Sequence, residues 1–230
     1  MIPFLELKNI TKYIKGISGS KQLVFDNLNA VINRDDSITS IFAPLGGGKT
    51  TLLRILSGLD NDYTGEISLN GKRIRHKFPY IPEKPSSFPW LNVSANIKQI
   101  IEIQEHNNGS LNIDMRNLIN LAGLTSYEDH IPFNKSYGFR FRISLARALV
   151  VSSPMILVDD SFHIMDPETK SEIFELIKTI ATTEKIKLIV ASSDIGDLAR
   201  LSNKILLINN KPGYLSTEIE IEEYYKEWKR

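Results

Sequence analysis

A glycine-rich run between an apolar segment and a helical pattern carries the strongest chemical signal in this sequence. The apolar segment covers 38–42 and the helical pattern covers 52–56. Between them lie Ala43, Pro44, Leu45, Gly46, Gly47, Gly48, Lys49, Thr50 and Thr51. A glycine-rich turn from strand to helix directs backbone N–H groups inward, and the helix N-terminus adds partial positive charge. Such a turn binds phosphate, with the lysine on the β and γ oxygens and the threonine hydroxyl on Mg²⁺. The run therefore predicts a nucleoside triphosphate site.

One departure and one alternative belong to this run. The strict motif opens with glycine where this sequence has Ala43, but three consecutive glycines keep the turn permissive. The alternative is an ordinary glycine-rich turn without a ligand. Lys49 and Thr50 stand in register between the expected strand and helix, so we favour the phosphate site.

Two adjacent carboxylates form the second candidate site. Asp159 and Asp160 follow a fully apolar segment over 155–158, which predicts a strand buried in a parallel sheet. At the carboxyl edge of such a sheet, a phosphate-loop enzyme holds Mg²⁺. Asp159 is the expected metal-side carboxylate, and Asp160 is expected to polarise the attacking water. The alternative is a polar strand end without a ligand, which the phosphate loop upstream makes the weaker interpretation.

Composition excludes several classes of protein. The chain has 230 residues, 42% of them hydrophobic, a net charge of +1 and no cysteine. Balanced charge argues against a nucleic-acid partner, and the lack of cysteine excludes disulfides and thiolate metal sites. No apolar run reaches the length of a membrane span. We expect a cytoplasmic protein that reaches a membrane only by docking onto a partner.

The order of the elements predicts an α/β fold. Strands are expected over 4–10 and 28–32, and an Asn-Gly hairpin over 67–74. The proline-rich stretch 79–89 is typical of a loop, and helical periodicity follows from Val93 to about Val151, with a surface loop over 106–110. Apolar strands return at 188–191 and 205–208. A phosphate-loop core is therefore interrupted by a helical insert and then resumed.

With these motifs the chain resembles the nucleotide-binding subunit of ATP-binding cassette transporters, nearly end to end. The run 43–51 matches the Walker A loop, Asp159 the Walker B aspartate, and Tyr13 the aromatic that stacks on adenine. Residues 164–166 look like the D-loop, and 144–149 match the helix after the signature motif. The stretches 87–97 and 211–213 are similar to importers of the nitrate, sulfonate and taurine group.

The resemblance implies a fold, ligands and partners. The fold is a P-loop NTPase (RecA-like) core with an antiparallel β subdomain, over 1–83 and 145–210, a helical subdomain over 84–144, and a tail over 211–230. The ligands are ATP and Mg²⁺. The partners are a transmembrane permease, a second ATP-binding subunit (identical or different) and, indirectly, a solute-binding protein. The expected location is the inner face of the cell membrane.

The signature and Q-loop positions depart from the family pattern. Lys135–Phe139 replaces Leu-Ser-Gly-Gly-Gln but keeps Ser136 and Gly138, which in the family touch the γ-phosphate held by the facing subunit. Tyr137 adds bulk between them. Glu83 takes the place of the Q-loop glutamine, where it can still reach Mg²⁺.

Two further departures bear on hydrolysis. The catalytic glutamate is replaced by Asp160, which withdraws the carboxylate by one methylene, and Ser193 stands where the family has the switch histidine. We interpret His76, His106, His130 and His163 as surface or loop residues. Losing a positioned acid/base or electrostatic group typically costs about 10²–10⁴-fold in rate. The sequence thus predicts ATP binding with slow hydrolysis.

Three functions fit these residues. The first is a transport ATPase. The second is a degenerate ATP-binding module beside a competent partner, and the third is a non-transport member of the same fold. We favour the transport ATPase, because the stretch around Phe88 and Trp90 corresponds to the region that adjoins the permease in the family. Packing of these two rings beneath the helical lobe is the alternative.

Overall fold

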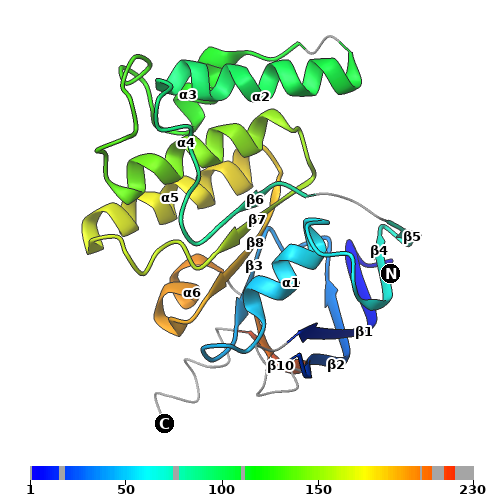
Figure 1. Cartoon of the computed structure of the whole chain (residues 1–230). Helices are drawn as coiled ribbons and strands as arrows, with labels where there is room; N and C mark the ends of the chain where they lie inside the picture. The colour runs from blue at the N-terminus through cyan, green and yellow to red at the C-terminus, as the bar shows by residue number, and fades with distance from the viewer. Residues whose placement is uncertain are drawn as a thin grey trace. The chain divides into compact units, whose positions relative to one another are not determined.

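The protein folds into two compact units, shown in a computed structural model (Figure 1). It describes residues 2–15, 19–74, 78–109, 112–202, 204–208 and 215–220. The first unit combines 1–78 with 187–230, and the second covers 79–186. The phosphate loop lies in the first unit and the paired carboxylates lie in the second.

An antiparallel sheet forms one part of the first unit. Its strands follow the order β2 (Lys21–Ile32), β1 (Leu5–Lys15), β4 (Thr64–Leu69) and β5 (Lys72–Arg73). The predicted hairpin is confirmed, because Asn70 and Gly71 join β4 to β5 with φ values of 51° and 76°. This left-handed backbone is the reason for the Asn-Gly pair.

Parallel strands form the other part of the first unit. β3 (Ile38–Phe42) pairs in parallel with β8 (Lys187–Ser192) and with β9 (Lys204–Ile208), and β10 (Leu215–Glu220) runs antiparallel to β9. Helices α1 (Lys49–Leu56) and α6 (Ile195–Leu201) follow β3 and β8. Strand β10 lies within the predicted tail over 211–230.

In its described residues, the second unit contains four helices and a pair of parallel strands. β6 (Tyr80–Ile81) pairs with β7 (Met155–Asp159). Helix α4 (Tyr137–Val150) contacts α2 (Val93–Asn108), α3 (Met115–Leu121) and α5 (Pro167–Thr183). Aromatic rings fill the interior: the ring centroid of Phe162 lies 5.8 Å from that of Phe141 and 5.1 Å from that of Phe174, and all three side chains are fully buried.

Two local expectations need correction. His106 and its two neighbours belong to α2, which continues to Asn108 and ends at Gly109 (φ 83°), so the predicted loop was placed too early. A short strand, β6, lies inside the predicted loop 79–89, because pairing with β7 satisfies its backbone groups.

Some predictions lie outside the described residues. These are His76, Ser110, the segment 211–213 and the part of the predicted tail over 221–230. The division into 1–83 with 145–210, 84–144 and 211–230 stays a prediction. Within the described ranges, every helix is too short or too polar to cross a bilayer.

Candidate nucleotide-binding site

The phosphate loop has a backbone that only glycine fits. Gly46 and Gly48 have φ values of 73° and 95°, and the Gly47 amide donates to the Pro44 carbonyl at 2.8 Å. A Cβ on Gly47 would lie 2.8 Å from the Ala43 Cβ, and one on Gly48 would lie 2.7 Å from the buried Phe25 ring. The loop is therefore a turn of glycines without side chains at the N-terminus of α1, where backbone N–H groups can bind an anion.

Lys49 brings a positive charge into this turn. Its side chain is buried, and its ammonium donates to the Ala43 carbonyl at 2.8 Å. Among the residues that the structure describes, this is the only hydrogen bond of the ammonium. A buried ammonium with two unused hydrogens fits an anionic partner such as phosphate oxygens. Thr50, next along α1, is exposed.

Tyr13 borders a separate hollow in the first unit. A cavity of about 200 Å³ lies beside it, lined also by residues of β1, by Lys21 of β2 and by Asp62, Tyr63 and Thr64, and none of the lining residues belongs to the phosphate loop. Tyr13 is half exposed, at 48%. The ring is thus accessible, as a stacking partner for a base requires.

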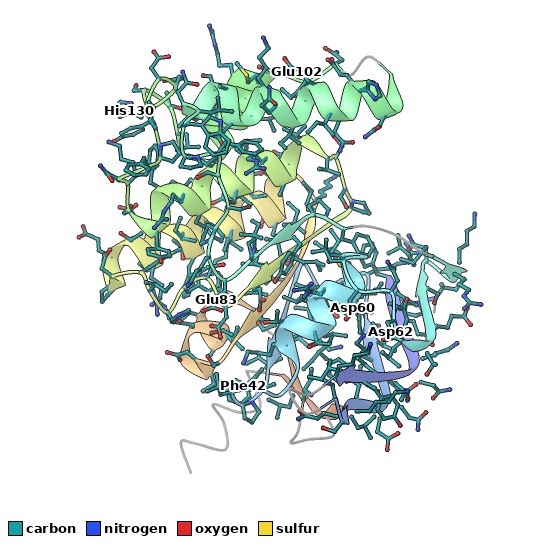
Figure 2. The ribbon with its side chains drawn as sticks, viewed as in Figure 1. Phe42, Asp60, Asp62, Glu83, Glu102 and His130 are labelled. Atoms are coloured by element: carbon teal, nitrogen blue, oxygen red, sulfur yellow. The ribbon has the colours of Figure 1, made fainter. Side chains whose placement is uncertain are left out.

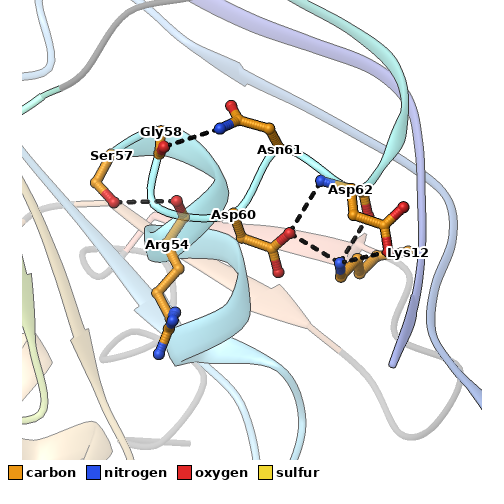
Figure 3. Close-up of polar contacts among 7 residues, drawn as sticks. All are labelled: Lys12, Arg54, Ser57, Gly58, Asp60, Asn61 and Asp62. Carbon is orange, nitrogen blue, oxygen red and sulfur yellow. Dashed lines mark hydrogen bonds and ion pairs between the residues drawn. The ribbon is translucent and has the colours of Figure 1, made fainter. Parts of the chain in front are cut away.

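A buried lysine holds the segment that lines this hollow (Figure 3). The Lys12 ammonium donates to Asp60 Oδ1 at 2.8 Å and to the Asp62 carbonyl at 2.6 Å. Asp60 also accepts from the Asp62 amide at 3.1 Å. These bonds tie β1 to the turn that follows α1.

Asp159 ends β7 as a buried carboxylate. Its side chain is 1% exposed, and its Oδ2 accepts a hydrogen bond from the Tyr80 hydroxyl at 2.8 Å. Tyr80 lies on the neighbouring strand β6, so the pairing of the two strands fixes the carboxylate. Tyr80 was not among the site residues predicted from the sequence.

Asp160 and Glu83 come close to His163, which is exposed in a turn, as predicted for a surface or loop residue. His163 Nδ1 lies 2.7 Å from the Asp160 carbonyl, and His163 Nε2 lies 3.5 Å from Glu83 Oε1. Asp160 itself has φ 27°, an unusual value for a residue with a side chain. Figure 2 labels Glu83 in the loop after β6. Sequence spacing gave no signal for this cluster, because Glu83 and His163 are far apart in the chain.

The signature positions form the start of α4. Ser136 is its N-cap and its hydroxyl accepts from the Phe139 amide at 3.2 Å, while Gly138 is buried in the first turn. Tyr137 lies beneath the Arg140 guanidinium, 4.2 Å from the ring centroid. Ser136 remains exposed at the helix N-terminus.

Asp166, at the D-loop position, caps α5. Its Oδ1 accepts from the Thr169 amide at 2.9 Å. This backbone hydrogen bond lowers the pKa of the Asp166 carboxyl. Ser193, at the switch position, is exposed between β8 and Asp194, the N-cap of α6.

The loop around Phe88 is held by a fully buried asparagine. Asn96 Nδ2 lies within hydrogen-bond distance of the carbonyls of Phe88 (3.1 Å) and Leu91 (2.9 Å), and Asn96 Oδ1 accepts from the Phe88 amide at 2.8 Å. Asn96 lies in the stretch 87–97 that resembles the importers, but this role of its side chain was not predicted from the sequence. Only this convergence of backbone groups explains a buried amide on an otherwise apolar helix face.

Arg147 fixes the same loop from α4. It donates to the Ser86 carbonyl at 2.7 Å, and its guanidinium lies 4.7 Å above the Phe88 ring. Burial lowers the pKa of this guanidinium. Phe88 is half-buried, so packing against the Arg147 guanidinium accounts for its position. Trp90, in contrast, is 71% exposed, and packing does not account for it.

Comparison with known proteins assigns the family. Residues 25–163 match the ABC transporter family. This chain belongs to the ABC transporter family. Its sequence is 31% identical over 219 residues to the aliphatic sulfonates import ATP-binding protein SsuB of Bacillus anthracis, covering 94% of this chain and 85% of the relative.

Solved structures share the fold of this ABC subunit. The ATP-binding cassette MJ0796, in a dimeric post-hydrolysis state bound to ADP and Pi, has a TM-score of 0.78 at 24% identity and covers 94% of this chain and 98% of its own. CbiO1 from Clostridium perfringens, part of the ABC transporter complex cbiONQ, has a TM-score of 0.81 at 20% identity, covering 99% and 92%. The predicted P-loop NTPase fold with an antiparallel β subdomain is confirmed.

Proposed function

We propose that this chain is the ATP-binding subunit of an importer, binding Mg-ATP and hydrolysing it slowly to drive solute uptake through a separate permease. The observation that carries the proposal is the phosphate loop. Gly46 and Gly48 have positive φ, a Cβ on Gly47 or Gly48 would clash with its surroundings, and the buried Lys49 ammonium keeps two hydrogens for phosphate oxygens. The import assignment is supported by the likeness to the sulfonates import protein.

Three side chains would hold magnesium. Mg²⁺ keeps several waters and binds one or two carboxylates with the substrate phosphates. Asp159 supplies a buried carboxylate, Thr50 a hydroxyl beside the phosphate loop, and Glu83 an exposed carboxylate after β6. The bound ion would neutralise charge on the β and γ oxygens.

We propose that the reaction is weakened at two positions. Asp160 holds its carboxylate one methylene short of the family's glutamate, and a misplacement of about 1 Å costs about a hundredfold in rate. Ser193 offers a neutral hydroxyl where the family has an imidazole. The groups assigned to binding, namely the loop amides, Lys49, Thr50 and Asp159, are all present.

The assembly that we propose has two ATP-binding subunits on a membrane permease. A likeness to a dimeric cassette supports the first part, and Ser136 is exposed at the N-terminus of α4, where it could meet a nucleotide held by a second subunit. The exposed Trp90 supports the second part, since a large exposed aromatic side chain is typical of an interface. The working location is then the cytoplasmic face of the membrane, with a solute-binding protein on the other side.

Nucleotide binding by the purified protein tests the proposal. Substitution Lys49→Ala removes the buried ammonium, and we expect binding of a fluorescent ATP analogue to fall below detection while Lys98→Ala, which removes an exposed lysine of α2, binds like the wild type. Equal affinity in Lys49→Ala and wild type would show that the loop is not the phosphate site.

A second function is favoured by Tyr137, Asp160 and Ser193 together. These residues suit a degenerate ATP-binding module that closes on ATP beside a competent partner and turns over little itself. Turnover of the isolated protein, compared with turnover in the complete membrane complex, separates the two functions. Hydrolysis by the isolated chain supports the transport ATPase, and hydrolysis only beside a different ATP-binding subunit supports the module.

A further inference from the structure

The turn after β7 holds Asp160 in a backbone conformation that needs support. Its φ of 27° lies outside the regions that residues with side chains prefer. The Asp160 carbonyl faces the ring of His163, at 2.7 Å from Nδ1. A carbonyl oxygen only accepts hydrogen bonds, so Nδ1 carries a hydrogen and donates it.

Glu83 orients the same ring from its other side. Glu83 Oε1 lies 3.5 Å from His163 Nε2, and Asp160 Oδ1 lies 4.0 Å from Nδ1. The ring therefore stands between the residue that follows β7 and the loop that follows β6. The ring can donate to both groups only when each nitrogen carries a hydrogen, and the bond to the Asp160 carbonyl needs the hydrogen on Nδ1.

Ser161 joins the same two loops beneath the ring. Its fully buried hydroxyl lies 2.9 Å from the Pro82 carbonyl and 2.8 Å from the Asp159 carbonyl. Pro82 precedes Glu83 in the chain. The ends of β6 and β7 are thus linked twice, by Ser161 in the interior and by His163 at the surface.

We propose that His163 is a positioning residue for ATP hydrolysis, holding the Asp160 turn through its Nδ1–H while Glu83 orients the ring. This inference rests on the proposed function, in which Asp160 polarises the attacking water. The Asp160 carboxylate is already one methylene shorter than that of glutamate, so any movement of its turn would misplace it further. His163 restricts that movement by fixing the Asp160 carbonyl, next to the side chain that must be aimed.

A positioning role and a purely structural role predict different effects of removing the His163 ring. The side chains of His163 and Glu83 are 47% and 52% exposed, so their contact contributes little to folding stability. Removing the ring also removes one hydrogen bond, to the Asp160 carbonyl. We therefore expect a lower rate of hydrolysis, an unchanged affinity for ATP and a melting temperature lowered by no more than about 2–4 °C.

Three substitutions at one position test the proposal. We expect His163→Ala to lower kcat by about tenfold or more, because misplacement by a fraction of an ångström already slows a reaction, with KM for Mg-ATP changed less than about twofold. His163→Asn places an amide N–H near the position of Nδ1 and should recover most of the loss. His163→Gln places its amide near the position of Nε2 and should stay close to the alanine variant. His106→Ala, at an exposed position of α2, is the control and should equal the wild type.

A spectroscopic measurement adds a test that does not depend on activity. Long-range ¹H–¹⁵N spectra of the nucleotide-free protein should show a proton on Nδ1 of His163. A ring protonated at Nε2 alone would overturn the proposal. Unchanged kcat in His163→Ala would overturn it as well. Equal kcat values in His163→Asn and His163→Gln would also overturn it, because only asparagine places its N–H near the position of Nδ1.

Failure of the inference can be told apart from failure of the proposed function. ATP binding is measured first, and a wild type that binds no ATP contradicts the proposed function. A wild type that binds and hydrolyses ATP, with His163→Ala at the same rate, contradicts only the inference. A wild type that binds ATP but shows no hydrolysis in a single-turnover assay overturns the role of His163 and leaves ATP binding intact.

Discussion

Gly138 packs directly against Thr169, joining the first turn of α4 to the first turn of α5. A Cβ placed on Gly138 would overlap the Thr169 Cγ2 methyl. Gly138 therefore has a packing role inside its own chain, in addition to the contact with a facing subunit that the family resemblance implies. Thr169 in turn donates its amide to Asp166, so the D-loop position and the signature position support one another.

Substitution Gly138→Ala should destabilise the protein through this overlap. We expect the free energy of unfolding to fall by about 1–3 kcal/mol, the usual cost of overpacking. In a Thr169→Ser background the methyl is absent, and the same substitution should be neutral or stabilising, because alanine is about 0.5–1 kcal/mol better than glycine within a helix. Denaturant unfolding of the four proteins measures this change of sign. Equal effects of Gly138→Ala in both backgrounds would contradict the contact.

The Asp166 cap should make stability depend on pH. The carboxyl has a lower pKa in the folded protein than in the unfolded chain, so its contribution is complete above the unfolded pKa, about 3.9, and is lost as pH falls through the folded pKa. In Asp166→Asn the amide oxygen can still accept from Thr169, but the side chain no longer titrates. The stability difference between wild type and Asp166→Asn should therefore shrink as pH falls from neutral to below the unfolded pKa in urea unfolding. A difference that stays constant over this range would show that the cap does not depend on charge.

The two altered catalytic positions predict a gain of function. Restoring Asp160→Glu together with Ser193→His should raise ATP turnover by at least about tenfold, because a positioned acid/base or electrostatic group contributes about 10²–10⁴-fold. Phosphate release measured on the purified protein checks the result, with nucleotide affinity as the control for intact binding. Unchanged turnover in the double variant would contradict the roles assigned to Asp160 and Ser193.

Local sequence determined the parts of this protein that depend on backbone preference. The phosphate loop and the Asn70–Gly71 turn were predictable because positive φ values demand glycine or asparagine at fixed offsets. The buried strands β7 and β8 were predictable because continuous apolar runs are typical of strands covered on both faces. Motif spacing alone was enough to identify the family.

Tertiary structure decided which distant residues meet. His163 reaches Glu83 only because β6 and β7 pair in parallel and end side by side within the second unit. Gly138 meets Thr169 only because α4 packs on α5, and Asn96 is buried only because a loop closes over it. These contacts arise from packing between segments far apart in the chain, and no local period or propensity encodes the distance between them.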